Sequence, residues 1–223
     1  MSITSKTPWW HLLSCSHQQN IHSSEETRSR ILDAAFAEIH RVGFQAASIQ
    51  NILKNTGLTK GALYHHFPNK NALGYAVVDE IISKSVHEIW ISKLEDAEDP
   101  IVVLQQIIID TGAVFTQEDI ELGCPLSNLS QEMSTIDPEF RTRLEKIYTN
   151  WRNSLEKTLE KGKKKGYVSD RVNSRQFSIV FIATLEGCIG MAKNSQDMSV
   201  LMDCGSGLIN LLNTLRPHGD DRV

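Results

Sequence analysis

The chain has 223 residues, of which 40% are hydrophobic and 22% charged, and its formal net charge is −4. This composition is typical of a packed globular protein and excludes an intrinsically disordered chain. The charge excludes a protein that is basic over its whole surface. No apolar run approaches the roughly 18 residues that a membrane-spanning helix needs, so the sequence predicts a soluble protein with no membrane partner.

Residues 1–24 are predicted to form a flexible N-terminal tail. They include Trp9 and Trp10 but lack the features of a cleaved signal peptide, and an apolar patch docked on the body is the alternative. The four cysteines are widely scattered and form no Cys-x-x-Cys pair; they are Cys15, Cys124, Cys188 and Cys204. This spacing favours a reduced, cytoplasmic protein over a disulfide framework or a zinc site.

Three helices are predicted in the first third of the chain, over residues 25–42, 49–55 and 60–66. The first has apolar residues at the i, i+3, i+4, i+7 spacing of an amphipathic helix, namely Ile31, Leu32, Ala35, Phe36, Ile39 and Val42. Ser48 and Thr59 stand where side-chain oxygens cap the second and third helices.

Six further helices complete an all-α fold of about nine helices. They begin at Asn69, Pro100, Leu126, Asp137, Asn173 and Met198, and no strand pattern competes with them. The lysine run at 161–165 is interpreted as the solvated end of a helix, with a nucleic-acid patch as the weaker alternative.

The last two helices predict a homodimer. The final helix repeats apolar or small residues at spacings of three and four, and its companion is apolar on more than one face, so each needs several neighbours. A four-helix interface between two subunits satisfies both. The predicted interface residues are Phe177, Phe181, Leu185, Leu201, Gly205, Leu208 and Leu212. Burial of this seam inside one chain is the alternative.

Charge is unevenly distributed along the chain. Between Glu38 and Asp79 there are 40 residues without Asp or Glu, whereas 27 acids in 223 residues predict about five there. The segment keeps seven basic or imidazole side chains: His40, Arg41, Lys54, Lys60, His65, His66 and Lys70. It is the part of the chain that a polyphosphate would not repel.

Two short helices joined by Thr56-Gly57-Leu58 match the helix-turn-helix, in which glycine permits the turn and the second helix enters the major groove. The sequence of residues 57–73 closely resembles the recognition segment of tetracycline-repressor (TetR/AcrR) family regulators. It reads Gly-Leu-Thr-Lys-Gly-Ala-Leu-Tyr-His-His-Phe-Pro-Asn-Lys-Asn-Ala-Leu. The resemblance covers residues 25–75 by residue type and the later helices by layout. It implies a DNA-binding head at 25–72, a ligand-binding and dimerisation body at 73–216 and a C-terminal tail at 217–223.

The resemblance also implies which residues meet DNA. The candidates are Ser48, Gln50, Thr59, Lys60, Gly61, Ala62, Tyr64, His65, His66 and Lys70. His66 and Lys70 would anchor the phosphate backbone, and Tyr64 could instead be a packing residue. Leu63 and Phe67 are predicted as core. Adjacent histidines point about 100° apart on a helix and no third ligand is evident, so neither a metal nor another cofactor is expected.

In this family the body encloses a pocket for a small-molecule effector, here unknown. Candidate lining residues are Trp90, Phe115, Trp151 and Phe181, with ordinary core packing as the alternative for each. The segments 123–132 and 185–193 resemble the electrophile- and oxidant-responsive members, in which a cysteine at the position of Cys124 reacts and a lysine at that of Lys193 can lie close to it. A nearby ammonium favours thiolate. A small buried hydrophobe is the alternative for Cys124.

The motifs of enzymes are missing: there is no phosphate loop, nucleophile turn or His-Glu-x-x-His helix. A helical adaptor that binds only protein would explain the seam but not the acid-free segment. The sequence therefore predicts a ligand-responsive repressor that binds a palindromic operator as a homodimer and is released by a small molecule or a reactive electrophile. It names neither operator nor effector, and it leaves the sign of control open.

Overall fold

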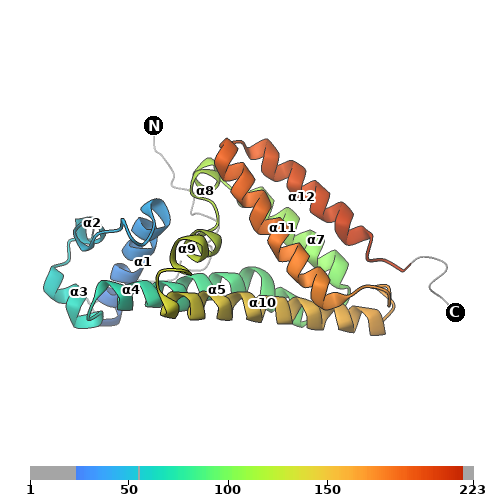
Figure 1. The fold of residues 1–223 in the computed structure, drawn as a ribbon, viewed down its shortest axis with the longest axis horizontal. Coiled ribbons are helices and arrows are strands. Elements are labelled where there is room, and N and C mark those ends of the chain that lie inside the picture. The colour runs from blue at the N-terminus through green and yellow to red at the C-terminus, as the bar shows by residue number, and fades with distance from the viewer. Residues whose placement is uncertain (1–23, 55, 218–223) are drawn as a thin grey trace. The chain divides into compact units, whose positions relative to one another are not determined.

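The computed structural model describes residues 24–54 and 56–217, which form helices joined by turns and short loops (Figure 1). The expected all-α class is confirmed, since this part of the chain contains no strand. The predictions for Trp9, Trp10 and Cys15, and for residues 218–223, fall outside the described residues.

The first three helices begin and end close to the expected positions: α1 (Ser24–Val42), α2 (Ile49–Lys54) and α3 (Lys60–His66). The fourth predicted helix is a succession of α-helical and wider π-helical turns: α4 (Lys70–Ala76), η2 (Val77–Ile82), α5 (Ser83–Val86), η3 (His87–Ile91) and α6 (Ser92–Glu95). The remaining helices are α7 (Pro100–Val114), α8 (Gln117–Leu122), α9 (Pro125–Met133), α10 (Pro138–Lys164), α11 (Ser174–Ser195) and α12 (Met198–Asn213).

The helix expected over residues 100–117 ends earlier in the structure, and a further helix that was not expected follows it. α7 ends at Val114, and α8 starts after Thr116. The Thr116 hydroxyl oxygen accepts from the Asp119 amide, while the Asp119 carboxylate accepts from the Thr116 amide at 2.7 Å. This reciprocal capping box satisfies the amides that begin a new helix, so it stabilises a break here.

The described chain divides into two compact units. The head unit comprises residues 24–54, 56–84 and 125–147, and the C-terminal unit comprises residues 85–124 and 148–217. The sequence placed the end of the head at residue 72. In the structure the head also takes in α9 and the start of α10, which are remote in sequence.

These remote segments pack on the turn between α1 and α2. The Phe44 and Phe140 ring centroids are 4.6 Å apart. A Cβ atom on Gly74 would lie 2.5 Å from Phe44 and 2.7 Å from Phe140, so only glycine allows this packing. The Glu132 carboxylate of α9 accepts hydrogen bonds from the Phe44 and Gln45 amides, each at 2.8 Å. The start of the predicted helix-turn-helix is therefore held by residues about 90 positions away.

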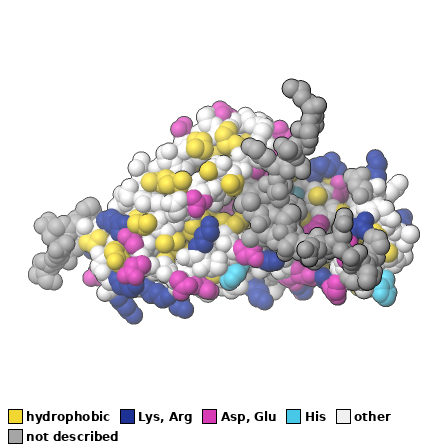
Figure 2. Space-filling view, turned by 180° about the vertical axis from the view of Figure 1, so that it is seen from behind, with side chains coloured by type: hydrophobic (Ala, Val, Ile, Leu, Met, Phe, Trp, Pro, Cys, Tyr) yellow, Lys and Arg dark blue, Asp and Glu magenta, His cyan; other side chains and the backbone are white. Residues whose placement is uncertain are grey.

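In the C-terminal unit, α11 packs against α12 and α8, and α12 packs against α7. By length and composition α11 could cross a membrane, although the core helix of a soluble protein passes the same test. The sequence pattern did not predict this because polar residues interrupt its apolar run. Figure 2 shows further hydrophobic side chains on the surface of the molecule, among uncharged polar atoms.

Candidate nucleic-acid interface

The turn between α2 and α3 is closed by Thr56. Its hydroxyl donates to the Leu53 carbonyl at 2.9 Å and accepts from the Leu58 amide at 3.1 Å. Gly57 has φ +67°, a left-handed conformation that costs glycine nothing because it lacks a Cβ. Arg30 of α1 donates to the Thr56 carbonyl at 2.6 Å. The turn is thus fixed both internally and to the first helix.

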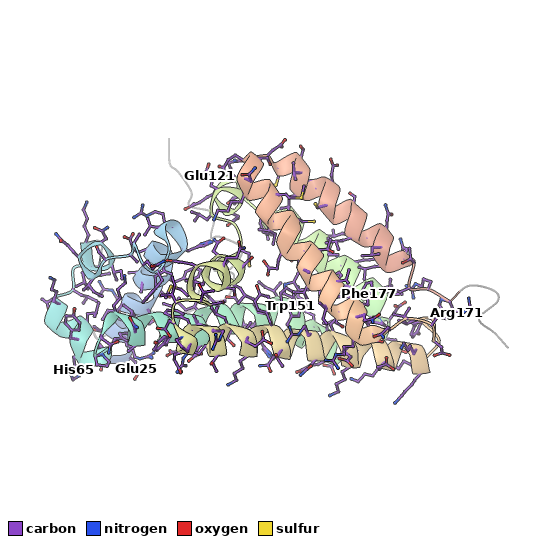
Figure 3. All side chains as sticks on the ribbon, viewed as in Figure 1. Glu25, His65, Glu121, Trp151, Arg171 and Phe177 are labelled. Atoms are coloured by element: carbon purple, nitrogen blue, oxygen red, sulfur yellow. The ribbon has the colours of Figure 1, made fainter. Side chains whose placement is uncertain are left out.

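α3 is anchored on one side and exposed on the other. Leu63 and Phe67 are buried, as the sequence predicts. The Thr59 side chain caps the helix by accepting from the Ala62 amide at 3.1 Å. The polar and small candidates are exposed or half-buried; they are Thr59, Lys60, Gly61, Ala62, Tyr64, His65 and His66. His65 lies at the outer edge of the head unit (Figure 3).

Tyr64 and Gly61 stand out on this face. Tyr64 is 47% exposed, a large fraction for an aromatic side chain. This exposure argues against the alternative that Tyr64 is a packing residue. Gly61 is the second residue of α3, and glycine destabilises a helix relative to alanine by up to about 1 kcal/mol. The nearest described atom to a Cβ added there is the Thr59 hydroxyl oxygen, at 3.7 Å. Packing within the head gives no reason for glycine at this position.

The start of α2 is adjacent in sequence and also accessible. Ser48 caps it by accepting from the Asn51 amide at 3.1 Å, and Gln50 is exposed. Glu38 of α1 accepts from Asn51 at 2.9 Å and from Arg41 at 2.6 Å. Although its burial acts in the opposite direction, these hydrogen bonds lower the pKa of Glu38. Glu38, which directly precedes the acid-free segment, therefore forms an ion pair with Arg41. Lys54 remains exposed.

Lys70 has a different environment from the one the sequence suggested. Its ammonium donates to the Gln45 carbonyl at 3.1 Å and lies 4.7 Å from the centroid of the Phe44 ring. Burial lowers the pKa of Lys70, against the opposing effect of Glu132. The structure thus gives this lysine a role in holding the turn between α1 and α2, which local sequence could not reveal.

The aromatic effector candidates form a cluster in the C-terminal unit. Trp90 lies 5.1 Å from Trp151 and 6.0 Å from Phe181, measured between ring centroids. All three are buried, and the Trp151 indole nitrogen has no hydrogen-bond partner in the described part of the chain. Trp151 is labelled in Figure 3. Phe115 is half-buried at the end of α7. Ring contacts therefore bring Trp90, Trp151 and Phe181 together.

Cys124 lies beside α11, and the residue that its thiol meets is Glu186. The Cys124 Sγ donates to Glu186 Oε1 at 3.4 Å. Lys193 is near as well, because a Cβ on Gly123 would lie 2.8 Å from Lys193 Cδ. The resemblance thus led to the right two segments but missed Glu186. An acid in the middle of an apolar helix was the available signal.

Glu186 is an unusual carboxyl group. Its Oε2 is buried and has no hydrogen-bond partner among the described residues. Burial raises the pKa of Glu186 to about 7, while the hydrogen bond from Cys124 acts in the opposite direction. Near neutral pH the group can therefore gain or lose a proton. A negatively charged Glu186 would favour the protonated thiol of Cys124, opposite to the effect expected of Lys193.

The predicted dimer residues do not share one environment. Phe181, Leu208 and Leu212 are fully buried within the chain, so they belong to its own core and have no surface to offer a partner. Phe177, Leu185, Leu201 and Gly205 are half-buried. The large exposed apolar side chains of these helices are others: Ile179, Val180 and Met191 on α11, and Met202 on α12.

The exposed α3, the glycine turn and the buried Leu63 and Phe67 define a helix-turn-helix protein of the DNA-binding class. The family model "Bacterial regulatory proteins, tetR family" matches residues 31–77, and "Tetracyclin repressor-like, C-terminal domain" matches residues 101–203. The chain belongs to the TetR family of transcriptional regulators, which are DNA-binding proteins and not enzymes.

Curated relatives match over most of their length. The Bacillus subtilis regulator YvdT is 30% identical over 159 residues, which cover 70% of this chain and 77% of that protein. The HTH-type transcriptional regulator LmrA of the same species is 28% identical over 189 residues, covering 84% and 97%.

Solved structures share the fold. A TetR regulator from Chloroflexus aurantiacus matches with a TM-score of 0.75 at 24% identity, covering 86% of this chain and 97% of that one. The reduced form of Escherichia coli NemR matches with a TM-score of 0.73 at 22% identity, covering 83% and 96%. At these identities the likeness extends to the fold alone.

Proposed function

We propose that this regulator is a cytoplasmic repressor that binds a near-palindromic operator as a homodimer and is released by an effector bound in its C-terminal unit. The observation that carries the DNA-binding part is Gly61. A helical glycine without a packing reason is explained if the α3 backbone must approach another surface closely, and the major groove is the surface that this motif meets.

The remaining contacts follow from the exposed face of α3. Lys60 and Tyr64 would contact phosphates or base edges, with Ser48 and Gln50 contributing from α2. Lys54 adds positive charge to a segment that contains no acid. Since ion release accompanies each lysine–phosphate contact, affinity should fall steeply as salt rises. Repression is the simpler sign of control because occupying a promoter needs no contact with polymerase.

Gly61→Ala tests the DNA-binding face. The variant should be more stable than the parent by up to about 1 kcal/mol, because alanine favours the helix. Its affinity for an operator fragment enriched from genomic DNA should nevertheless fall by at least roughly tenfold, equivalent to about 1.4 kcal/mol. Gly112→Ala is the matched control, since Gly112 is also helical with no atom within 4 Å of its added Cβ. Unchanged affinity in Gly61→Ala would refute the proposed face.

The homodimer is supported by the exposed face of α11. Val180 and Met191 are 52% and 62% exposed, and Gly187 lies between them on the same side of the helix. Apolar and small residues on one face of a long helix favour close packing against a second copy. Two copies would place two heads for two half-sites, which is why a two-fold symmetric operator is proposed.

Val180→Asp tests this interface. Sedimentation should show a monomer for this variant and a dimer for Val102→Asp, which changes an equally exposed valine on α7. A dimer that survives Val180→Asp would move the interface to another surface.

The effector is proposed to act in the C-terminal unit, where Trp90, Trp151 and Phe181 supply an aromatic cluster and Cys124 a thiol. An electrophile with an activated carbon–carbon double bond would be attacked by the Cys124 sulfur, forming a sulfur–carbon bond. The thiol proton would pass to Glu186 and then to the adjacent carbon. If an electrophile releases operator equally from the parent and from Cys124→Ser, Cys124 is not the group that reacts.

A further inference from the structure

A second pair of reactive side chains lies away from Cys124, at the seam between α11 and α12. Cys188 of α11 and Cys204 of α12 each lie eight residues from Gln196, in the turn that joins the two helices, so the packing of α11 on α12 places them at the same level. Both are free thiols, and their helices pack directly against one another. Cys188 is 7% exposed, whereas Cys204 is half-buried.

We propose that Cys188 and Cys204 form an oxidation site, at which a low-molecular-weight disulfide such as glutathione disulfide converts the two thiols into an intrachain disulfide joining α11 to α12. The helix contact supplies the geometry. A disulfide joins residues whose Cα atoms lie within about 7 Å through a sulfur–sulfur bond of about 2.05 Å, and facing positions on two packed helices can meet this condition.

The position in the helices keeps the pair in register. On α12, Leu208 follows Cys204 by one helical turn, and Leu208 is buried within the chain. On α11, Ala192 follows Cys188 by one turn and is likewise buried. Each cysteine is therefore part of the packed stripe of its helix and cannot rotate away from the other without exposing that stripe.

The reaction begins at the more accessible thiol. Cys204 loses its proton to solvent, and its sulfur attacks one sulfur of the small disulfide. A mixed disulfide forms on Cys204 as the original sulfur–sulfur bond breaks and one small thiolate leaves. The Cys188 sulfur then attacks the Cys204 sulfur, and the second small thiolate leaves with the Cys188 proton. Two protein thiols are oxidised, and one small disulfide is reduced to two thiols.

The environment of Cys188 agrees with this order of steps. Burial, together with the hydrogen bond and charge of Cys204, raises the pKa of Cys188 to about 12. Cys188 therefore stays protonated and does not attack first, since the thiolate is the nucleophile. In the mixed disulfide Cys204 carries no thiolate charge, so one of the causes that hold Cys188 protonated is removed.

The test uses the full-length chain with Cys15→Ser and Cys124→Ser, so that only the two seam cysteines remain. The reduced protein is incubated with glutathione disulfide, quenched with iodoacetamide and weighed intact by mass spectrometry. The expected product has lost two hydrogen atoms, carries no glutathione and runs as a single chain on a non-reducing gel. Adding Cys188→Ser should leave a stable glutathione adduct on Cys204. Adding Cys204→Ser should leave Cys188 reduced.

Three results would overturn the proposal. One is a glutathione adduct that persists on the variant with both seam cysteines. Another is a linked pair of chains on the non-reducing gel. The third is a disulfide that forms only after the protein has been unfolded in guanidinium, because the folded seam would then oppose the bond. None of these readouts involves DNA, so the test of the oxidation site does not depend on the proposed operator binding.

Discussion

Replacing Glu186 with glutamine should change how stability depends on pH. In the folded chain the pKa of Glu186 is about 7, raised by burial from an ordinary value of 4.5, while the hydrogen bond from Cys124 acts against the rise. A carboxyl group with a raised pKa favours the folded state when it is neutral. Its contribution is therefore fully present below about pH 4.5, is lost as the pH rises towards 7 and stays lost above it.

The size of the effect follows from the difference between the folded pKa of Glu186 and its ordinary value. Each pKa unit corresponds to about 1.36 kcal/mol, so the upper bound is about 3 kcal/mol. Because Glu186 is half-buried, solvent screening reduces this to about 2 kcal/mol. Glutamine has a similar shape but no charge. The Glu186→Gln variant should thus gain stability over the parent as the pH rises from 5 to 8, by about 2 kcal/mol in total.

The assay is urea unfolding of both proteins across that pH range at one fixed protein concentration, since a dimer's apparent stability depends on concentration. Glu121→Gln is the control, because Glu121 is an exposed acid on α8 of the same unit (Figure 3). A stability difference between Glu186→Gln and the parent that is the same at pH 5 and pH 8 would show that Glu186 is not an ionising group of the core.

Three further changes test the head unit by urea unfolding. Glu132→Ala leaves two backbone amides without their acceptor and should lower the free energy of unfolding by about 2–3 kcal/mol. Gln131→Ala, at the exposed neighbouring position, should change it by no more than about 0.5 kcal/mol. Equal effects would mean that the Glu132 carboxylate does not hold the turn. Gly74→Ala places a Cβ 2.5 Å from an aromatic ring and should cost about 1–3 kcal/mol, so a neutral result would contradict the packing. Thr59→Ala removes the α3 cap and should cost about 1 kcal/mol; Thr59→Ser should restore it if the hydroxyl is responsible.

Local sequence determined the DNA-binding motif. The caps at Thr59 and Asn69, the turn at Gly57 and the buried Leu63 all act within a few residues of one another. Short-range hydrogen bonds and the helical period suffice to place α2 and α3 and to separate the exposed face of α3 from its core. α8 was missed although its Thr116–Asp119 capping box is local, because the helix expected from Pro100 was extended to residue 117 and residues 118–122 were assigned to no helix.

Only the tertiary structure decided which partners meet across long separations. Glu132 reaches the turn at Phe44, Lys70 donates into that same turn, and the thiol of Cys124 meets Glu186 on α11. Nothing in the local pattern of these residues selects one partner among many.

The α12 seam shows the same limit. Its spacing of three and four was predicted to join two subunits, yet Leu208 and Leu212 are buried within one chain. An apolar stripe on a helix predicts that this face is buried. The pattern is the same whether the helix that covers it belongs to the same chain or to another. The choice depends on how the other helices fold around it, which periodicity along one helix does not encode.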